Sequence, residues 1–394
     1  MIAADQQRAA DGRKLRIAVV HSFYSASQPS GENSAVRTHV DALRRWGHDV
    51  RLISTETDRE RTRPAFQLRA AARVATGRGQ SPREELERWR PDIVYVHNLF
   101  PNYARRWALD IDVPLVAVLH NYRPLCANGM LLRDGGVCTL CPDGQRWAGV
   151  RYACYRGSRL ATLPLAWANR KGPAADSLLE AADRILMLSP LQQEVYVRAG
   201  VPPEKIVVIP NFLPDELDPG VGDPAAVRSG WLFVGRISEE KGVHHLVRHW
   251  PAGAPLRIVG DGPMESEVRG LAAGKDIEFL GRQPREDVVR LMQQSRGVVF
   301  SSLWYEGFPL VYVEAMACGT PVLALGPSVV SDMVEAEGTG IPLEWDHLPK
   351  GLRDVEEVFA GLTEQCRGAF EGCYSEGTFR IQLDHLHTEL GLEP

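Results

Sequence analysis

The segment WYEGFPLVYVEAMACGTPVLA, residues 304–324, decides the fold class. An apolar run just before it, GVVFSS (297–302), is typical of a buried strand. Within the segment we predict a loop at EGFP, a helix over LVYVEAMAC that ends at Gly319, and a second strand at PVLAL. A strand, a helix and a strand in this order predict a right-handed crossover between parallel strands.

The same alternation of short apolar runs and helical patterns extends over most of the 394 residues. Toward the N-terminus the predicted strands are LRIAVVHS (15–22), DVRLIST (49–55), DIVYVHN (92–98), PLVAVLHN (114–121), RILMLS (184–189) and KIVVIPN (205–211). Toward the C-terminus they are GWLFVGR (230–236), PLRIVGDGP (255–263), IEFLGR (277–282), GVVFSS and TPVLAL (320–325). We therefore predict an α/β protein with two doubly wound, Rossmann-like domains that face each other across a crevice.

A segment rich in Pro, Gly and Asp, residues 210–224, separates the two series of strands and is the predicted linker. The predicted N-terminal domain spans residues 14–212, and the predicted C-terminal domain spans residues 225–370. Residues 371–394 contain the amphipathic pattern FRIQLDHLHTEL and are predicted to form a C-terminal helix. Residues 1–13 are predicted to be a disordered leader.

The composition excludes several classes of function. Hydrophobic residues make up 44% and charged residues 24%, as in ordinary soluble proteins, and the net charge of −5 gives no basic excess for nucleic acid. No apolar run reaches the roughly 18 residues of a membrane span, and the polar start lacks the apolar core of a secretory signal. The expected compartment is the cytoplasm. Seven cysteines without an export signal argue against a disulfide framework.

Two glutamates interrupt the apolar segment. Glu306 is predicted just before the helix, and Glu314 about two turns further in than Glu306, so they are not an i,i+4 pair. Because ligands bind beyond the carboxyl ends of parallel strands, both could reach one elongated ligand in the crevice. A glutamate buried in an apolar helix must be paired or must bind a ligand. The alternative is that Glu314 pairs with a structural arginine.

Two cations follow another predicted strand, in FVGRISEEKG (233–242). Arg236 and Lys241 precede a helix expected near Gly242, and cations beside a helix N-terminus suit a diphosphate. The alternative is a strand–helix loop with solvated side chains. The glycines of IVGDGP (258–263) allow either close approach to a nucleotide or a tight turn, and the turn is favoured.

Three further candidates lie in the predicted N-terminal domain. Gly31, in the loop SFYSASQPSGEN after the first strand, could let the backbone meet a phosphate; a flexible loop is the alternative. His97 and His120 end two strands at the crevice edge. Histidines there can bind a substrate hydroxyl or transfer protons, although a lone histidine is more often structural.

Together, GRISEEKG, GDGP, EGFPLVYVEAMACGTPV and the PSGEN loop resemble the retaining glycosyltransferases of family 4, which have the GT-B fold. The resemblance runs from about Leu15 to Glu389, nearly the whole chain. The E-x7-E element formed by Glu306 and Glu314 is among the more specific motifs of that family. The C-terminal helix is similar to the helix that crosses back onto the N-terminal domain in that fold. The resemblance implies an enzyme of the hexosyltransferase type with a nucleoside-diphosphate sugar as co-substrate.

The resemblance also implies roles by position. His120 and Glu306 would act at the reacting centre, Glu314 would bind the ribose hydroxyls of the nucleotide, and His97 is a candidate acceptor contact. The donor diphosphate would be bound by Gly31, Arg236, Lys241, Phe308, Pro309, Leu310 and Val311. The donor sugar would be bound by Glu306, Gly307 and Phe308.

The implied chemistry fits these residue types. Breaking a sugar–phosphate bond leaves negative charge on the diphosphate, which fixed cations and helix dipoles stabilise. No Asp-x-Asp loop follows a predicted strand, in agreement with a metal-independent mechanism that needs no cofactor. In the family's usual description, configuration is retained, the leaving phosphate takes the acceptor proton, and the domains close over the donor.

The acceptor is left open by the sequence: a polysaccharide, a lipid-linked glycan or a small natural product all fit. Two alternatives to the transferase also stay open, a catalytically inactive nucleotide-binding module and a nucleotide-sugar epimerase. A phosphorylase would need a lysine for pyridoxal phosphate, and none stands out.

Two segments suggest additional partners. Residues 121–158 form a predicted insertion on the acceptor side, with a C-x11-C-x2-C-x12-C spacing that could hold a structural zinc or could be a set of free thiols. Its cysteines are Cys126, Cys138, Cys141 and Cys154. The Arg-rich, helical residues 59–90 could touch the inner, anionic face of a membrane, or could form a solvated helical face.

Overall fold

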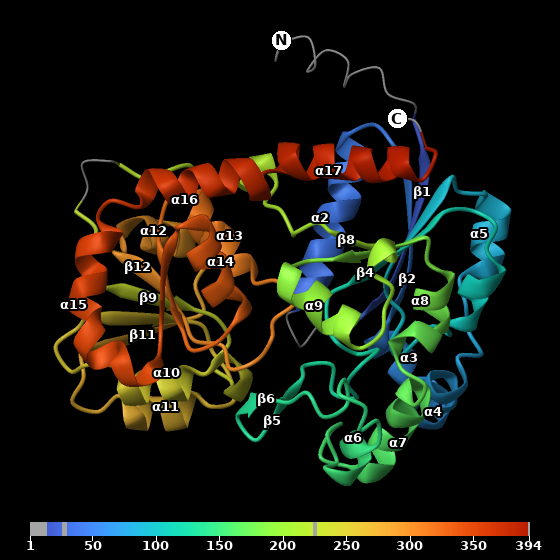
Figure 1. Cartoon of the computed structure of the whole chain (residues 1–394), viewed down its shortest axis with the longest axis horizontal. Coiled ribbons are helices and arrows are strands. Elements are labelled where there is room, and N and C mark those ends of the chain that lie inside the picture. The colour runs from blue at the N-terminus through green and yellow to red at the C-terminus, as the bar shows by residue number, and fades with distance from the viewer. Residues whose placement is uncertain (1–13, 26–29, 224–226, 393–394) are drawn as a thin grey trace. The chain divides into compact units, whose positions relative to one another are not determined.

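The computed structural model describes residues 14–25, 30–223 and 227–392. The chain forms two compact units (Figure 1). Among the described residues, the first unit contains those up to Met130, Thr139–Pro210 and those from Phe379 onward. The second unit contains Leu131–Cys138 and Asn211–Thr378. The predicted leader lies outside the described residues.

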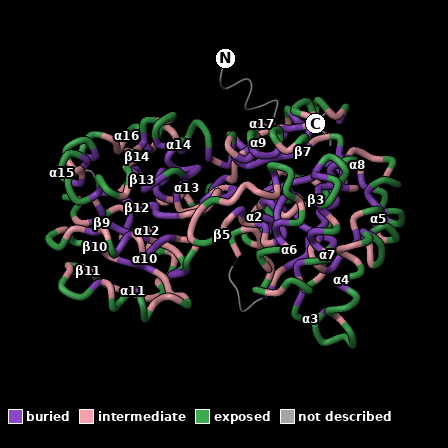
Figure 2. The backbone as a smooth tube through the Cα atoms, turned by 60° about the horizontal axis from the view of Figure 1, so that its bottom comes forward, coloured by how far each residue is buried: buried purple, intermediate pink, exposed green. Residues whose placement is uncertain are grey.

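The first unit is built on a six-stranded parallel sheet in the order β2-β1-β3-β4-β7-β8. The strands are β1 (Arg16–Phe23), β2 (Asp49–Glu56), β3 (Ile93–Asn98), β4 (Leu115–Leu119), β7 (Arg184–Met187) and β8 (Ile206–Val208). The helices are α2 (Gly31–Arg45), α3 (Thr57–Arg61), α4 (Phe66–Thr76), α5 (Arg83–Trp89), α6 (Ala148–Arg151), α7 (Arg159–Asn169), α8 (Ser177–Ala181) and α9 (Pro190–Arg198). Strands β3 and β4 are buried along their whole length, as expected for parallel strands covered on both faces (Figure 2).

The C-terminal helix α17 (Glu376–Glu389) packs on the first unit from Phe379 onward. Phe379 lies edge-on to His39 of α2, with ring centroids 5.5 Å apart. The hydroxyl of Tyr95 in β3 is 2.7 Å from Nε2 of His387. Leu383 of the same helix is fully buried. The last helix therefore completes the core of the unit that contains the first strands.

The second unit contains another six-stranded parallel sheet, in the order β11-β10-β9-β12-β13-β14. The strands are β9 (Trp231–Val234), β10 (Leu256–Val259), β11 (Ile277–Gly281), β12 (Gly297–Phe300), β13 (Val322–Leu325) and β14 (Gly340–Leu343). The helices are α10 (Val243–His249), α11 (Glu265–Leu271), α12 (Arg285–Gln294), α13 (Leu310–Ala317), α14 (Val329–Glu337), α15 (Leu348–Phe359) and α16 (Thr363–Ala369), with a π-helical turn at Phe370–Tyr374. A short hairpin, β5 (Leu132–Arg133) with β6 (Gly136–Val137), is also assigned to this unit.

The two sheets confirm the prediction of two parallel, doubly wound domains. The predicted strands are present, but strand β14 was missed. Its sequence, GIPL, is short, and Pro342 normally argues against a strand. Strand β14 lies at the edge of the sheet, where a residue without an N–H group is tolerated. The hairpin β5–β6 was missed as well.

Glycines bring two strand-end loops of the second unit into backbone contact. A Cβ atom on Gly260, which follows β10 and has φ +131°, would lie 1.9 Å from the carbonyl oxygen of Gly235, which follows β9. A Cβ atom on Gly262 would lie 2.2 Å from the carbonyl oxygen of Ile237. The IVGDGP glycines thus serve close packing between the two loops, a role beyond the simple turn favoured by the sequence.

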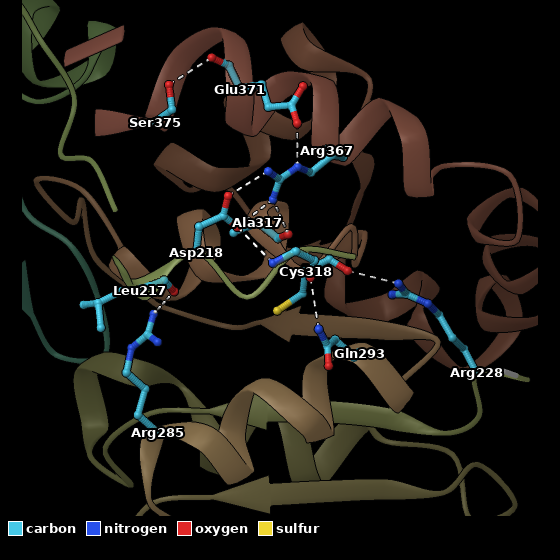
Figure 3. Close-up of polar contacts among 11 residues, drawn as sticks. Leu217, Asp218, Arg228, Arg285, Gln293, Ala317, Cys318, Arg367, Glu371 and Ser375 are labelled. Carbon is cyan, nitrogen blue, oxygen red and sulfur yellow. Dashed lines mark hydrogen bonds and ion pairs between the residues drawn. The ribbon is translucent and has the colours of Figure 1, made fainter. Parts of the chain in front are cut away.

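The segment that follows Pro210 is held by the second unit (Figure 3). The guanidinium of Arg367 donates two hydrogen bonds to the carboxylate of Asp218, at 2.6 and 2.7 Å. Arg285 donates to the carbonyl oxygen of Leu217 at 3.1 Å, and Gln293 donates to that of Gly220 at 3.0 Å. Over Asn211–Asp223, this proline- and aspartate-rich segment is therefore fixed by side-chain hydrogen bonds rather than by a strand ladder.

Candidate functional site

A buried ion pair connects two strand-end loops of the second unit. Nζ of Lys241 lies 2.5 Å from Oε1 of Glu306, and the hydroxyl of Ser302 donates to the same oxygen. Glu306 is only 6% exposed. Lys241 follows β9 and Glu306 follows β12, and these two strands are neighbours in the sheet. The sequence predicted both residues as donor ligands, and the structure adds that they are partners of each other.

The N-terminus of α13 begins four residues after Glu306 and carries no side-chain cap. Pro309, the last residue of the predicted EGFP loop, is the N-cap, and no acidic residue lies in the first turn. The N–H groups of Leu310 and Val311 have no acceptor within the helix, because the first turn of any helix lacks one. With the helix dipole, these N–H groups favour an anion. The centroid of the Phe308 ring lies 5.6 Å from that of the Tyr374 ring.

Glu314 lies in α13, about one turn from this terminus. Burial raises the pKa of its carboxyl group, and the positive charge of Arg285 partly opposes this. Nη2 of Arg285 is 3.6 Å from Oε1 of Glu314. An arginine partner, the alternative considered from the sequence, is therefore present. That arginine is the first residue of α12, and its side chain is 37% exposed.

Glu314 is expected to cost stability at neutral pH. Because the folded state raises its pKa, the folded state binds the proton more tightly, and stability falls as the pH rises above the usual value of about 4.3. Glu314→Gln, which stays neutral, should therefore raise Tm at pH 7.5, and the gain should shrink as the pH approaches about 4. Tm measured between pH 4 and 8 checks this. A lower Tm for the variant at every pH would contradict it.

Arg236 and Gly235 follow β9 directly. The side chain of Arg236 is exposed and makes no hydrogen bond or ion pair with other described residues. Gly307 precedes Phe308 and is buried. The structure thus brings Lys241, Glu306 and the start of α13 together, and leaves Arg236 as a solvent-facing cation of the same loop.

In the first unit, the two predicted histidines are in direct contact. Nδ1 of His97, at the end of β3, is 2.8 Å from Nε2 of His120, just after β4. Nε2 of His97 is 3.1 Å from Nδ1 of a third histidine, His39 in α2, which the sequence analysis did not select. Burial lowers the pKa of His120 and of His39 to about 3, and lowers that of His97 well below its usual range.

Gly31 is the first residue of α2, and the hydroxyl of the N-cap residue Ser30 accepts a hydrogen bond from the N–H of Asn33. The loop before it, residues 26–29, lies outside the described residues. The next residue, Glu32, was also missed. Its Oε2 accepts a hydrogen bond from Asn121 at 3.0 Å, and its Oε1 is buried without a partner in the part of the chain that the structure describes. Burial raises its pKa to about 7.

A cavity of about 90 Å³ lies beside the histidines in the first unit. His97 and His120 contribute to its wall. The guanidinium of Arg123, another wall residue, lies 4.1 Å from the centre of the Phe100 ring. Arg105, also in the wall, pairs with Asp176. The wall of the cavity therefore combines apolar side chains with polar groups, although Arg123 already donates to the carbonyl oxygens of Ala127 and Asn128.

A structural zinc at the four cysteines of residues 121–158 stays a prediction. Within the described part of the chain, no group of three His, Cys, Asp or Glu side chains that could hold a metal ion is found. Cys126 is buried, and Cys138, Cys141 and Cys154 are half-buried. Sγ of Cys126 donates to Oδ1 of Asn128 at 2.9 Å.

The Arg-rich residues 59–90 form α3, α4 and α5, which present many exposed arginines. Several of these arginines pair with acidic neighbours, as Arg83 does with Glu87 and Asp110. None of the helices in the described residues is both long enough and apolar enough to cross a bilayer.

Comparison with protein families decides the assignment. Residues 29–217 match the family model "Glycosyltransferase Family 4", and residues 230–357 match the model "Glycosyl transferases group 1". Two segments that together span most of the chain thus each match a glycosyltransferase family. The first match contains strands β2, β3, β4, β7 and β8 of the first sheet, although it begins after β1, and the second contains the whole of the second sheet.

Known relatives of this glycosyltransferase differ in their reported activities. An uncharacterized glycosyltransferase of Methanocaldococcus jannaschii is 30% identical over 189 residues, which is 42% of this chain and 47% of the relative. A glycogen synthase of Mycobacterium tuberculosis is 25% identical over 296 residues, 71% of this chain and 64% of the relative. A D-inositol 3-phosphate glycosyltransferase of a Mycobacterium species is 31% identical over 218 residues, 50% and 48% of the two chains. The chain thus spans about half to two thirds of the length of these relatives.

Solved structures confirm the GT-B fold of the glycosyltransferase. Sucrose-phosphate synthase of Thermosynechococcus elongatus has a TM-score of 0.67 and 19% identity, with 96% of this chain and 99% of that chain covered. HepE of Anabaena, solved in complex with UDP, has a TM-score of 0.59 and 16% identity, with 95% and 100% covered. At these identities the likeness concerns the fold alone.

Proposed function

We propose that this chain transfers a sugar from a nucleoside-diphosphate sugar to an acceptor hydroxyl, with retention of configuration and without a metal ion. The observation that carries the proposal is the buried Lys241–Glu306 pair beside the uncapped N-terminus of α13. A lysine and free helical N–H groups at one place form a site for a diphosphate. The matches to the two glycosyltransferase families support the same conclusion.

In this proposal, different residues of the second unit bind different parts of the donor. Lys241 and the N–H groups of Leu310 and Val311 bind the diphosphate and stabilise the negative charge that grows on it as the sugar–phosphate bond breaks. Arg236 adds a second, exposed cation from the same loop. Glu306 accepts hydrogen bonds from hydroxyls of the donor sugar while it holds Lys241 in place.

Glu314 accepts hydrogen bonds from the ribose hydroxyls. A carboxylate whose pKa is raised by burial has lost hydration, and two vicinal hydroxyl donors would replace the water. Retention follows in this proposal because the leaving phosphate takes the acceptor proton on the face from which it departs, so no carboxylate base is needed on the opposite face. A relative of the same fold was solved with UDP, which supports a uridine nucleotide as the first candidate.

The first unit supplies the acceptor side in this proposal. His120 and His97 border a cavity whose walls combine apolar surface with arginine and amide donors. Such a lining suits a polyhydroxylated acceptor, which packs its C–H faces on apolar groups and directs its hydroxyls to donors. A glycan, a lipid-linked intermediate and a small natural product share this chemistry.

Thermal shifts with a panel of nucleoside diphosphates and their sugars, in EDTA, test the proposal. A ligand bound only by the folded state at a hundredfold excess over its Kd adds about 2.7 kcal/mol of stability. We expect one nucleotide to raise Tm, and we expect Glu314→Ala to abolish that rise. Glu265→Ala, at a half-buried glutamate of α11 that pairs with Arg269, is the matched control and should keep it.

The outcomes separate the alternatives. No shift with any nucleotide would overturn the donor site. A shift without donor hydrolysis or transfer would indicate a nucleotide-binding module, and interconversion of the free nucleotide sugar would indicate an epimerase. NMR of the first product formed assigns its anomeric configuration, and an inverted product would contradict retention.

A further inference from the structure

The first unit contains three histidines joined in one row by hydrogen bonds. The row runs from His120 through His97 to His39, with contacts of 2.8 and 3.1 Å between ring nitrogens. The rings of His97 and His120 are stacked, with centroids 5.1 Å apart and an angle of 19° between their planes. His39 and His97 are 4% and 7% exposed, so the row leads from the cavity into the core.

All three imidazoles are neutral at physiological pH, because burial lowers the pKa of each and a charge on one disfavours a charge on the next. A neutral imidazole has one N–H and one lone pair. Each contact in the row needs one of each. Only two arrangements satisfy both contacts: all three rings carry the proton on Nδ1, or all three carry it on Nε2.

The inner end of the row distinguishes the two arrangements. Nε2 of His39 is buried and has no hydrogen-bond partner among the residues that the structure describes. The ring lies between those of Tyr95 and Phe379, with centroids 5.1 and 5.5 Å away. If the protons are on Nε2, an N–H group is orphaned there. If they are on Nδ1, only a lone pair of Nε2 is left without a partner. Buried N–H groups without an acceptor are rarer in protein interiors than buried acceptors without a donor.

The outer end of the row belongs to His120. Its Nε2 is used by His97, so its Nδ1 is the nitrogen that remains for a ligand. Both histidines line the cavity of the first unit. A further histidine, His21, has its ring 6.4 Å from that of His97 but is hydrogen-bonded to Asn33, so it is not a link in the row.

We propose that His39 and His97 are positioning residues that fix the tautomer of His120, so that His120 presents an N–H group at Nδ1. His120 is then a hydrogen-bond donor to a substrate oxygen and not a proton acceptor. This decides between the two roles that the sequence left open for a histidine at a strand end. The bearing on catalysis rests on the proposed transferase function, whereas the tautomer itself does not.

NMR of the full chain with 15N-labelled histidine tests the proposal, because nitrogen shifts distinguish protonated from unprotonated ring nitrogens. At pH 7 we expect His39, His97 and His120 all to carry the proton on Nδ1. A mixture of tautomers among the three, or a common Nε2–H form, would overturn the proposal. This measurement needs no variant, so it decides the matter even if substitutions in the core unfold the protein.

Two variants of residue 39, with side chains of nearly equal size, test whether His39 sets the tautomer of His120. His39→Gln can still donate to His97 and should keep His120 in the Nδ1–H form. His39→Met offers only a weak acceptor, so Nε2–H forms of His97 and His120 should become populated. His387→Met, at another fully buried histidine that bonds Tyr95 and not the row, is the control and should leave His120 unchanged.

Activity provides a second readout once a donor is known. We expect His39→Met to lower kcat/KM tenfold to a hundredfold, the usual order for groups that orient a ligand-binding residue, and His39→Gln to stay near wild type. If His120 keeps its Nδ1–H form in His39→Met, the positioning role is refuted. If the tautomer switches and no nucleotide sugar is turned over by the wild type, only the proposed function fails.

Discussion

Lys241→Met is expected to abolish most of the transferase activity and to destabilise the second unit. The substitution leaves Glu306 buried with Ser302 as its remaining partner in the described structure. Removing one member of a buried pair costs about 3–5 kcal/mol, and we expect the lower end because the Lys241 side chain is 26% exposed. Loss of the cation facing the leaving diphosphate should lower kcat by about 10²–10³.

The double variant Lys241→Met/Glu306→Gln separates the two effects. It removes both charges and keeps an oxygen for Ser302, so most of the lost stability should return while activity stays low. Urea unfolding followed by tryptophan fluorescence gives the stability, and donor hydrolysis gives the rate. Equal stability of the single variant and the wild type would show that the pair is not a buried one in solution. Restored activity in the double variant would remove Lys241 from the proposed site.

Gly242→Ala is expected to cost about 3 kcal/mol or more. Gly242 has φ +64°, and a Cβ atom there would lie 2.0 Å from the carbonyl oxygen of Ser301. A left-handed alanine costs about 1–2 kcal/mol, and overpacking against fixed backbone adds roughly 1–3 kcal/mol. Because Ser301 follows β12 and Gly242 follows Lys241, the strain would separate the two loops that hold the ion pair.

Gly281→Ala is the matched control for this prediction. Gly281 has φ +65°, nearly the same backbone conformation, and a Cβ atom there meets nothing within 4 Å. It should therefore show the left-handed cost alone, about 1–2 kcal/mol. Free energies of unfolding for the two variants check the difference. Equal losses would mean that the loop after β9 relaxes freely away from Ser301.

The sequence predicted the scaffold well because each signal was local. Apolar runs and the glycines after helices specify strands and helix ends within a few residues, as in α13, which ends just before Gly319. Edge strand β14 was not predicted because Pro342 argues against a strand. The proline is tolerated there only because β14 lies at the edge of the sheet.

The site was predicted less completely because its key features are pairs. Lys241 and Glu306 are 65 positions apart, so nothing local indicates that they neutralise each other. His39 lies on the buried face of an amphipathic helix, where it is indistinguishable from a core residue until β3 places His97 against it. Glu32 stood next to the selected Gly31, yet only burial shows that its carboxyl group is unusual.

The position of α17 has a consequence for how the protein is made. The core of the first unit is completed by Phe379 and Leu383, which are translated only after the whole of Asn211–Thr378. At about 5–20 residues per second, that intervening stretch takes on the order of 10–30 s to synthesise. During this interval the apolar surface of β1 and α2 that α17 later covers is exposed to solvent, and His39 lacks its contact with Phe379. The nascent first unit therefore exposes this apolar face until α17 has been synthesised.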